Sequence, residues 1–152
     1  MVTKGSLEWL VALEEIRMLR TRYSRLIDAH KWEGLAEVLA PDCRMDLSQA
    51  AAFLGATDAD NRRAEGRAEI ISFLNASFSS AKMTLHIATL PEIEFDGDDR
   101  AHGIWRQETY VKEACPELPG CGIAYGTVWD EYVRLDRRWY IQSVTVGLDM
   151  VM

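Results

Sequence analysis

Cysteine is scarce in this chain of 152 residues, which contains only Cys43, Cys115 and Cys121. An odd number of cysteines without framework spacing is not typical of a disulfide-stabilised secreted domain. We therefore predict reduced thiols and a cytoplasmic location. Cys115 and Cys121 fall in one predicted loop, so a disulfide between these two residues is the alternative.

Long apolar runs and excess basic charge are also missing. No segment approaches the ~20 apolar residues that cross a bilayer. The N-terminal stretch MVTKGSLEWLVALEE turns acidic early and has no small-residue cleavage site, unlike a signal peptide. The 24 acidic residues outnumber the 17 basic ones, giving a net charge of −7, which opposes binding to a phosphate backbone. We predict that the protein binds neither membranes nor nucleic acid.

Motifs for several kinds of chemistry are absent as well. The sequence contains no serine nucleophile elbow and no Gly-rich phosphate loop. Its three histidines, His30, His86 and His102, have no carboxylates at ligand spacing, so we predict no metal site. There is no internal repeat, and this length suits one hydrophobic core, which predicts a single domain over residues 1–152.

The first half of the chain carries helical patterns. Apolar residues recur with the helical period after Ser6, which predicts a helix over residues 7–29 with this serine as its N-cap. Two more helices are predicted over residues 32–40, where Pro41 ends the pattern, and over residues 67–78.

Between these helices the pattern changes twice. Residues 43–47 alternate in polarity, as expected of a short strand. Residues 49–64 combine an apolar patch with a polar run and predict a loop. Because long ordered loops are often functional, this segment is either a lid over a pocket or a surface insertion without a role.

The second half carries strand patterns. Four strands are predicted over residues 82–95, 100–112, 123–135 and 138–148, with turns at residues 96–99 and 136–137. Pro91 predicts a bulge or an edge position in the first of them. Helices followed by an antiparallel meander indicate an α+β fold. A sheet curled around the helices would enclose a cone-shaped interior, a suitable small-molecule site.

Two polar residues are candidates for such a site, and each has a structural alternative. Asp28 lies about 140° around the first helix from Tyr23, off the apolar stripe, as expected of a surface residue at a helix end. His86 stands on a strand among apolar neighbours and, taken alone, would be a satisfied core histidine.

Three segments resemble the SnoaL-like branch of the NTF2-like (cystatin-like α+β barrel) superfamily over about residues 8–148. They are IRMLRTRYSRLIDAHKWEGLAEVLAPDCRMD, LHIATLPEIEFDGDDRAHGIWRQETYV and YGTVWDEYVRLDRRWYIQSVTV. The likeness is greatest to scytalone dehydratase, bile-acid 7α-dehydratases and hexachlorocyclohexane dehydrochlorinase. The resemblance implies elimination chemistry without metal or organic cofactor, by a histidine base that a helix-1 aspartate orients.

Carried over by position, the resemblance makes His86 the base, Asp28 its orienting carboxylate and Tyr23 a hydrogen-bond donor to the substrate. It also makes Trp105 a pocket residue. The sequence departs from the family in two places. Thr109 stands where the bile-acid enzymes have an acidic residue, and no histidine occurs near Val111, where scytalone dehydratase has its second one.

The resemblance implies a dehydratase-type lyase acting on a cyclic, mostly apolar substrate such as a steroid, polyketide or terpenoid. A proton-transfer isomerase would need the same base, and a ligand-binding protein without turnover would keep the same cavity. Besides Trp105, we expect Met45, Phe53, Leu54 and Tyr125 to line the pocket. The resemblance further implies a homodimer or homotrimer.

Overall fold

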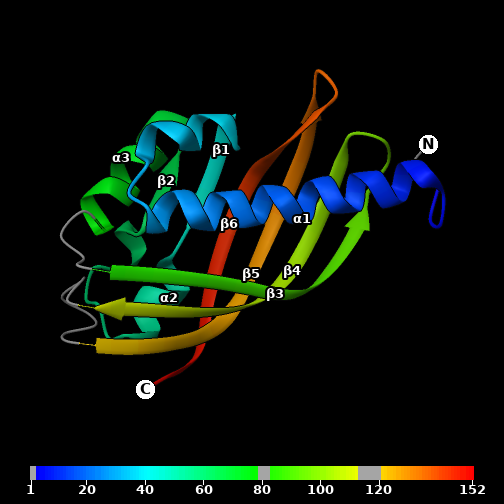
Figure 1. Cartoon of the computed structure of the whole chain (residues 1–152). Helices are drawn as coiled ribbons and strands as arrows, with labels where there is room; N and C mark the ends of the chain where they lie inside the picture. Colours follow the sequence, from blue (N-terminus) through cyan, green and yellow to red (C-terminus); the bar gives the residue numbers. More distant parts are fainter. Residues whose placement is uncertain (1–2, 79–82, 113–120) are drawn as a thin grey trace.

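The computed structural model describes residues 3–78, 83–112 and 121–152 (Figure 1). Its α-helices are α1 (Leu7–Asp28), α2 (Ser48–Phe53) and α3 (Arg67–Phe78), and its 3₁₀-helices are η1 (Trp32–Glu37) and η2 (Ala59–Asn61). Its strands are β1 (Leu39–Asp46), β2 (Arg63–Glu65), β3 (Met83–Phe95), β4 (Arg100–Lys112), β5 (Cys121–Leu135) and β6 (Arg138–Val151). Cys115 and the side chain of Cys121 lie outside the described residues, whereas Cys43 is a buried free thiol.

The six strands form one sheet in the order β2-β1-β6-β5-β4-β3. Strands β3 to β6 form the predicted antiparallel meander, and β1 adds to β6 in parallel. The sheet is curved and does not close, since its described residues show no pairing between the two edge strands β2 and β3. The predicted α+β, NTF2-like architecture is confirmed, with an open rather than a complete barrel.

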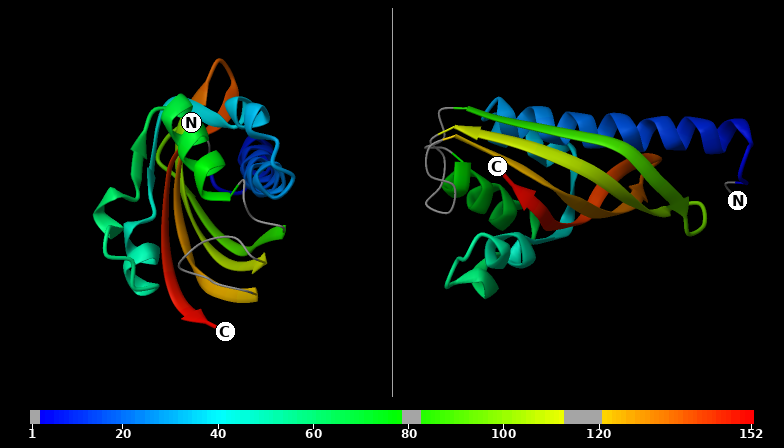
Figure 2. Two further views of the ribbon diagram at one scale, coloured as in Figure 1. Left: turned by 90° about the vertical axis from the view of Figure 1, so that its left-hand side faces the viewer. Right: turned by 90° about the horizontal axis from the view of Figure 1, so that it is seen from below.

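Helix α1 lies along the concave side of the sheet, which curves around it (Figure 2). The predicted cap is present, because the Ser6 hydroxyl accepts a hydrogen bond from the Trp9 amide at 3.1 Å. Buried apolar residues of α1, such as Ile16 and Leu19, join the core with side chains from β1, β4, β5 and β6. The end of α1 packs beside the edge strand β3.

The turns and the bulge follow the sequence signals. The register between β3 and β4 shifts between Thr89 and Glu92, around Pro91, and Leu90 has a φ of 50°. The β5–β6 turn places Asp136 and Arg137 at φ values of 47° and 67°, as a two-residue hairpin of matching twist requires.

The predicted helix over residues 32–40 is wrong in part. Only a 3₁₀-helix to Glu37 forms, and Leu39 already begins β1. Pairing with β6 overrides helical propensity here, because Leu39 and Ala40 become fully buried when they extend the sheet. Pro41 therefore lies inside β1, where the register against β6 is irregular, rather than at a helix end.

The predicted loop over residues 49–64 is more ordered than expected. It contains most of α2, all of η2 and the beginning of β2. Asp46 fixes both ends of this segment, because its carboxylate accepts hydrogen bonds from the Ser48 amide at 2.8 Å and from Arg63 Nε at 3.0 Å.

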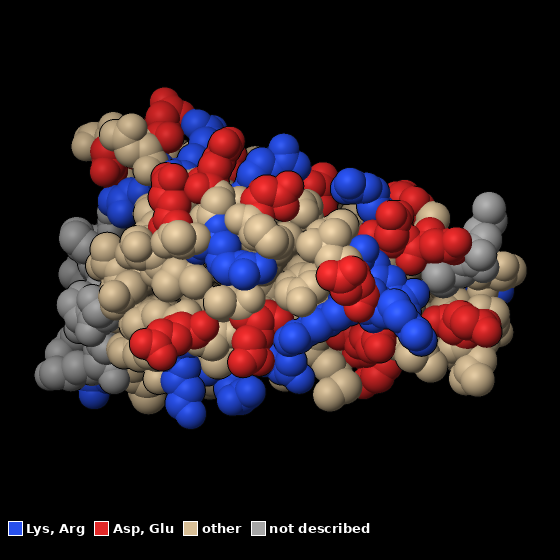
Figure 3. Space-filling view, turned by 90° about the horizontal axis from the view of Figure 1, so that it is seen from above, with Lys and Arg blue, Asp and Glu red and all other residues tan. Residues whose placement is uncertain are grey.

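None of the helices in the described ranges combines the length and the apolar composition that crossing a bilayer needs. On the face shown in Figure 3, acidic and basic side chains are interspersed with uncharged ones and do not gather by sign.

The core contains a buried ion pair, in which Arg20 Nη1 lies 3.2 Å from Asp130 Oδ1. The next residue along β5, Glu131, lies 3.1 Å from Arg44 on the exposed face. Both side chains of the first pair are at most 2% exposed, whereas those of the second are more than half exposed. Two pairs of similar distance thus differ strongly in burial.

We expect Asp130→Asn to lower the free energy of unfolding by about 3 kcal/mol, because it leaves the buried Arg20 guanidinium without its counter-charge. Glu131→Gln, the matched control, should change it by less than about 1 kcal/mol. Urea denaturation of both variants measures the difference. Equal losses in the two variants would contradict this view of the core.

Candidate active site

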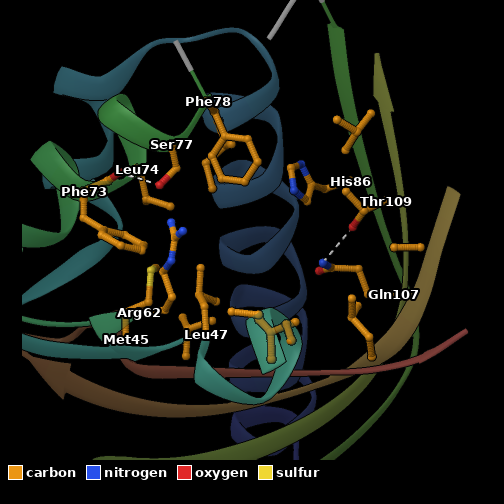
Figure 4. A pocket seen from close by; sticks show the side chains of 18 of the residues that line it. Met45, Leu47, Arg62, Phe73, Leu74, Ser77, Phe78, His86, Gln107 and Thr109 are labelled. Carbon is orange, nitrogen blue, oxygen red and sulfur yellow. Dashed lines mark hydrogen bonds between the residues drawn. The ribbon is translucent and has the colours of Figure 1, made fainter. Parts of the chain in front are cut away.

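A cavity of about 170 Å³ lies between the concave side of the sheet and helices α1, α2 and α3. Most of its wall is apolar. Its polar lining residues are Arg20, Tyr23, Arg62, Ser77, His86, Gln107 and Thr109. Figure 4 shows side chains from both halves of the chain converging on this space. A mostly apolar cavity with a few converging polar groups is the usual form of a small-molecule site.

His86 reaches the cavity from β3, and Asp28 holds it from the last position of α1. Asp28 Oδ1 lies 2.6 Å from His86 Nδ1, and Asp28 Oδ2 accepts a hydrogen bond from the His86 amide at 2.9 Å. The Thr84 hydroxyl donates to the same carboxylate at 3.1 Å. An ionised carboxylate only accepts hydrogen bonds, so Nδ1 carries the proton and the acceptor lone pair is on Nε2.

The environment of the pair is largely dry. The side chains of His86 and Asp28 are 11% and 15% exposed. The Phe78 ring meets the imidazole edge-on at 5.7 Å between centroids. Nε2 has no hydrogen-bond partner among the described residues, which leaves it available to a molecule in the cavity.

Helical periodicity suggested that Asp28 is a surface residue, which is not what the structure shows. Asp28 points away from the apolar stripe of α1, but β3 curves past the end of α1 on that side and covers it. An edge strand has amides that no neighbouring strand accepts, and Asp28 binds one of these amides, that of His86. The curvature of the sheet, which the pattern of α1 does not contain, decides the burial of Asp28.

Tyr23 lines the cavity from the buried face of α1. Its hydroxyl makes no hydrogen bond to another described residue, and the Arg20 guanidinium lies 4.9 Å from its ring centroid. Burial raises the pKa of the Tyr23 phenol well above its ordinary value, with Arg20 opposing the shift. The hydroxyl therefore stays protonated over the whole physiological range and can donate a hydrogen bond into the cavity.

The five predicted pocket residues divide into two groups. Met45 and Leu54 line the cavity, but Trp105, Phe53 and Tyr125 do not. The prediction that Trp105, Phe53 and Tyr125 line the cavity is therefore wrong, and each residue is kept from the cavity for a different local reason.

Trp105 is on the same face of β4 as Gln107 and Thr109 but does not line the cavity. Its indole is 3% exposed and donates a hydrogen bond to the Tyr132 hydroxyl at 2.9 Å. Tyr125 is displaced by strand alternation, since its neighbour Ala124 is the residue that lines the cavity. Phe53 is at the outer side of α2 and is 51% exposed.

Sequence patterns missed several lining residues. Arg62, Phe73, Ser77 and Phe78 come from the segment before β2 and from α3, and all four project toward the cavity in Figure 4. The signal for Phe73 and Phe78 was present in the apolar pattern of the third predicted helix. Arg62 carried no such signal, because it lies in a polar run.

Gln107 and Thr109 were also missed as a pair. They lie two residues apart on β4, so both face the cavity, and Thr109 is the cross-strand partner of His86. Glu108, between them, faces the other way and accepts a hydrogen bond from the Tyr110 hydroxyl at 2.9 Å. Strand alternation would have predicted Gln107 once Thr109 was placed in the cavity, but the pairing of Thr109 with His86 requires the β3–β4 register, which the sequence does not contain.

The other histidines lie away from the cavity. His30 follows α1 with a φ of 53° and stacks on Trp32 at 5.4 Å between ring centroids. His102 lies 2.8 Å from Asp96 on the surface. Within the described ranges, no three His, Cys, Asp or Glu side chains are grouped as metal ligands would be.

Comparison with known proteins agrees with this architecture. The family model of the SnoaL-like domain matches residues 9–145. Among solved structures, a scytalone dehydratase-like protein from Novosphingobium aromaticivorans superposes with a TM-score of 0.78 at 21% identity, covering 95% of this chain and 89% of the other. A type 2 hexachlorocyclohexane dehydrochlorinase gives 0.80 at 16% identity, with 96% and 90% covered.

The type 3 dehydrochlorinase of Novosphingobium barchaimii gives a TM-score of 0.78 at 16% identity, with 96% of this chain and 92% of the other covered. At these identities the likeness to solved structures is one of fold. The family match spans nearly the whole chain. The chain belongs to the family of SnoaL-like domains, in the NTF2-like superfamily.

Proposed function

We propose that this protein is a cofactor-independent lyase that eliminates water from a cyclic, mostly apolar substrate such as a steroid, polyketide or terpenoid. One observation carries the proposal: Asp28 lies 2.6 Å from Nδ1 of His86, a residue that lines an apolar cavity and whose Nε2 has no hydrogen-bond partner among the described residues. The similarity of fold to a scytalone dehydratase-like protein and to dehydrochlorinases agrees with elimination chemistry.

The reaction begins with proton transfer to His86. Its neutral imidazole removes a proton from a substrate carbon through Nε2, a suitable step for histidine near neutral pH. The Asp28 carboxylate stabilises the imidazolium that results. The electron pair of the C–H bond forms the new double bond, and the C–O bond of the leaving hydroxyl breaks. The departing hydroxide takes the proton back from His86 and leaves as water, so the base is regenerated.

Tyr23 is the proposed polarising donor. Its protonated hydroxyl lines the same cavity and is placed to donate a hydrogen bond to a carbonyl or leaving oxygen of the substrate. The apolar wall favours a substrate with few polar groups and excludes bulk water from the imidazolium. By family resemblance we also propose that the protein functions in the cytoplasm as a homodimer or homotrimer.

Two other functions use the same geometry. An isomerase would return the proton to a different carbon of the substrate, with His86 as the carrier and no loss of water. A ligand-binding protein would retain the cavity without turnover. The presence of an oriented base with a free Nε2 favours the two enzymes over the binder, because apolar binding alone does not require a buried carboxylate beside an imidazole.

We expect His86→Ala and Asp28→Asn each to lower kcat by about 10²–10⁴-fold, the usual contribution of a general base. Turnover is measured by ultraviolet absorbance of the new double bond, against a panel of hydroxysteroids and cyclic polyketides. Thr84→Val is the matched control, because Thr84 binds the same carboxylate but not the imidazole. Undiminished turnover in both dyad variants would eliminate the mechanism.

We also expect Tyr23→Phe to lower kcat by about 10–10³-fold while the protein stays folded, since only a hydroxyl that donates to the substrate is removed. The mass of the product then identifies the reaction. A product lighter by one water indicates the lyase, whereas a product of unchanged mass indicates the isomerase. Tight binding of panel compounds by the wild-type protein without any product would favour the binder and overturn the proposal.

A further inference from the structure

The wall beside His86 contains a hydrogen-bonded pair of neutral residues, Gln107 and Thr109. Both line the cavity from β4, and Thr109 is directly across from His86 in the β3–β4 register. Directly opposed residues of antiparallel strands have Cβ atoms about 4.5–5.5 Å apart. The Thr109 hydroxyl therefore lies next to the base, as Figure 4 shows.

Arg20 fixes which way the Gln107 amide points. Its Nη2 lies 2.7 Å from the Gln107 side-chain oxygen, and a guanidinium only donates hydrogen bonds. The amide oxygen must therefore face Arg20, which turns the NH₂ group toward Thr109. The Gln107 Nε2 donates to the Thr109 hydroxyl oxygen at 3.1 Å.

This order of bonds determines what faces the cavity. The Thr109 oxygen already accepts a hydrogen bond, so its own O–H is free to donate. Gln107 keeps a second N–H beyond the one it gives to Thr109. Neither hydrogen has an acceptor among the described residues, and both groups lie on the cavity wall.

The charge behind the pair is buried and held in place. Arg20 is 2% exposed and pairs with Asp130, which also accepts a hydrogen bond from the Tyr132 hydroxyl at 2.7 Å. Burial raises the pKa of the Asp130 carboxyl, and the Arg20 guanidinium opposes this shift. A hydrogen bond from a buried cation polarises the amide that accepts it, so the N–H groups of Gln107 become stronger donors.

We propose that Gln107 and Thr109 form an oxyanion-binding donor pair beside His86, and that Arg20 and Asp130 are the residues that position it. The pair binds a substrate oxygen that gains negative charge as His86 removes the neighbouring proton. The substrate class that fits is a cyclic compound with a carbonyl next to the acidic C–H bond. This assignment rests on the proposed role of His86 as a base.

The donor pair also accounts for the absence of an acidic side chain at position 109. Neutral donors stabilise a developing oxyanion without transferring a proton, and each is worth about 10²–10³-fold in kcat where such groups have been removed. They add no net charge to the apolar cavity. The leaving oxygen then accepts its hydrogen bond from Tyr23 on α1.

Gln107→Glu is the sharpest test, because it is nearly isosteric and reverses the bonds. One carboxylate oxygen still accepts from Arg20, while the other replaces the NH₂ group and accepts from Thr109. Thr109 then turns its hydrogen away from the cavity, and both donors are lost. We expect kcat to fall at least about 100-fold, with a similar fall in Thr109→Val and a smaller one in Thr109→Ser, which keeps a hydroxyl. Arg20→Lys, which cannot bind Gln107 and Asp130 in the same fork, should lower kcat more than it raises KM.

A binding measurement separates this proposal from the proposed function, because it needs no turnover. The probe is 2-naphthol, compared with naphthalene, and its ionisation in the cavity is followed by fluorescence as a function of pH. The wild-type protein should bind the naphtholate more tightly than naphthalene by at least about tenfold, or 1.4 kcal/mol. Gln107→Glu and Thr109→Val should lose this preference, whereas Glu108→Gln, the neighbour that faces away, should keep it.

Each outcome has one consequence. Equal binding of naphtholate and naphthalene by the wild-type protein would overturn the donor pair, as would an unchanged preference in Gln107→Glu. A preference that depends on Gln107 and Thr109 in a protein without elimination activity would support the donor pair while the lyase proposal fails. Circular dichroism of each variant confirms that the fold is retained before the comparison is made.

Discussion

The carboxylate of Asp28 connects the end of α1 to the outer edge of the sheet, and the geometry of the cavity depends on this connection. The sheet does not close, so in the described part of the chain β3 has no neighbouring strand on its outer side. Asp28 takes the place of such a neighbour by accepting the His86 amide and the Thr84 hydroxyl. The same carboxylate holds His86 Nδ1. One residue thereby fixes the position of the strand and the tautomer of its imidazole.

A second polar connection lies deeper, between Arg20 of α1 and Asp130 of β5. Burying an ion pair costs desolvation energy, which attraction between the charges offsets only with good geometry and further hydrogen bonds. Here Gln107 and Tyr132 supply those bonds. The two connections lie eight residues apart on one helix, about two turns. Between them lies Tyr23, which lines the cavity as Arg20 does, whereas Asp28 acts on the cavity through His86.

The regular parts of this fold follow from local patterns. The helix over residues 67–78 and the strand over residues 100–112 have the predicted bounds, because their apolar spacing and flanking turns agree with their packing. Residues 38–40 did not follow their helical pattern, since pairing with β6 buries them more completely. Only the tertiary structure contains that competition, so the local sequence could not reveal it.

The candidate site was predictable only at positions where the family resemblance assigned a role to the residue. Asp28 and His86 are 58 residues apart, and the helical pattern placed Asp28 on the wrong side. Tyr125 was misplaced by one step of strand alternation, which a sequence without a known register cannot settle. The connection from Arg20 to Gln107 joins α1 to β4 across 87 residues of sequence. No local pattern contains such a contact.

The residues of the proposed catalytic group and the residues of the outer cavity wall come from different elements of the fold. Asp28, His86, Gln107 and Thr109 belong to α1, β3 and β4, which the core and the sheet hold in place. Ala50, Ala51, Leu54 and Arg62 belong to the segment between β1 and β2, which packs on β6 and is fixed by Asp46 at both ends. No hydrogen bond joins the described side chains of that segment to the Asp28–His86 pair. Substitutions in this segment would therefore change the shape and charge of the cavity wall while leaving the hydrogen bonds of the Asp28–His86 pair in place.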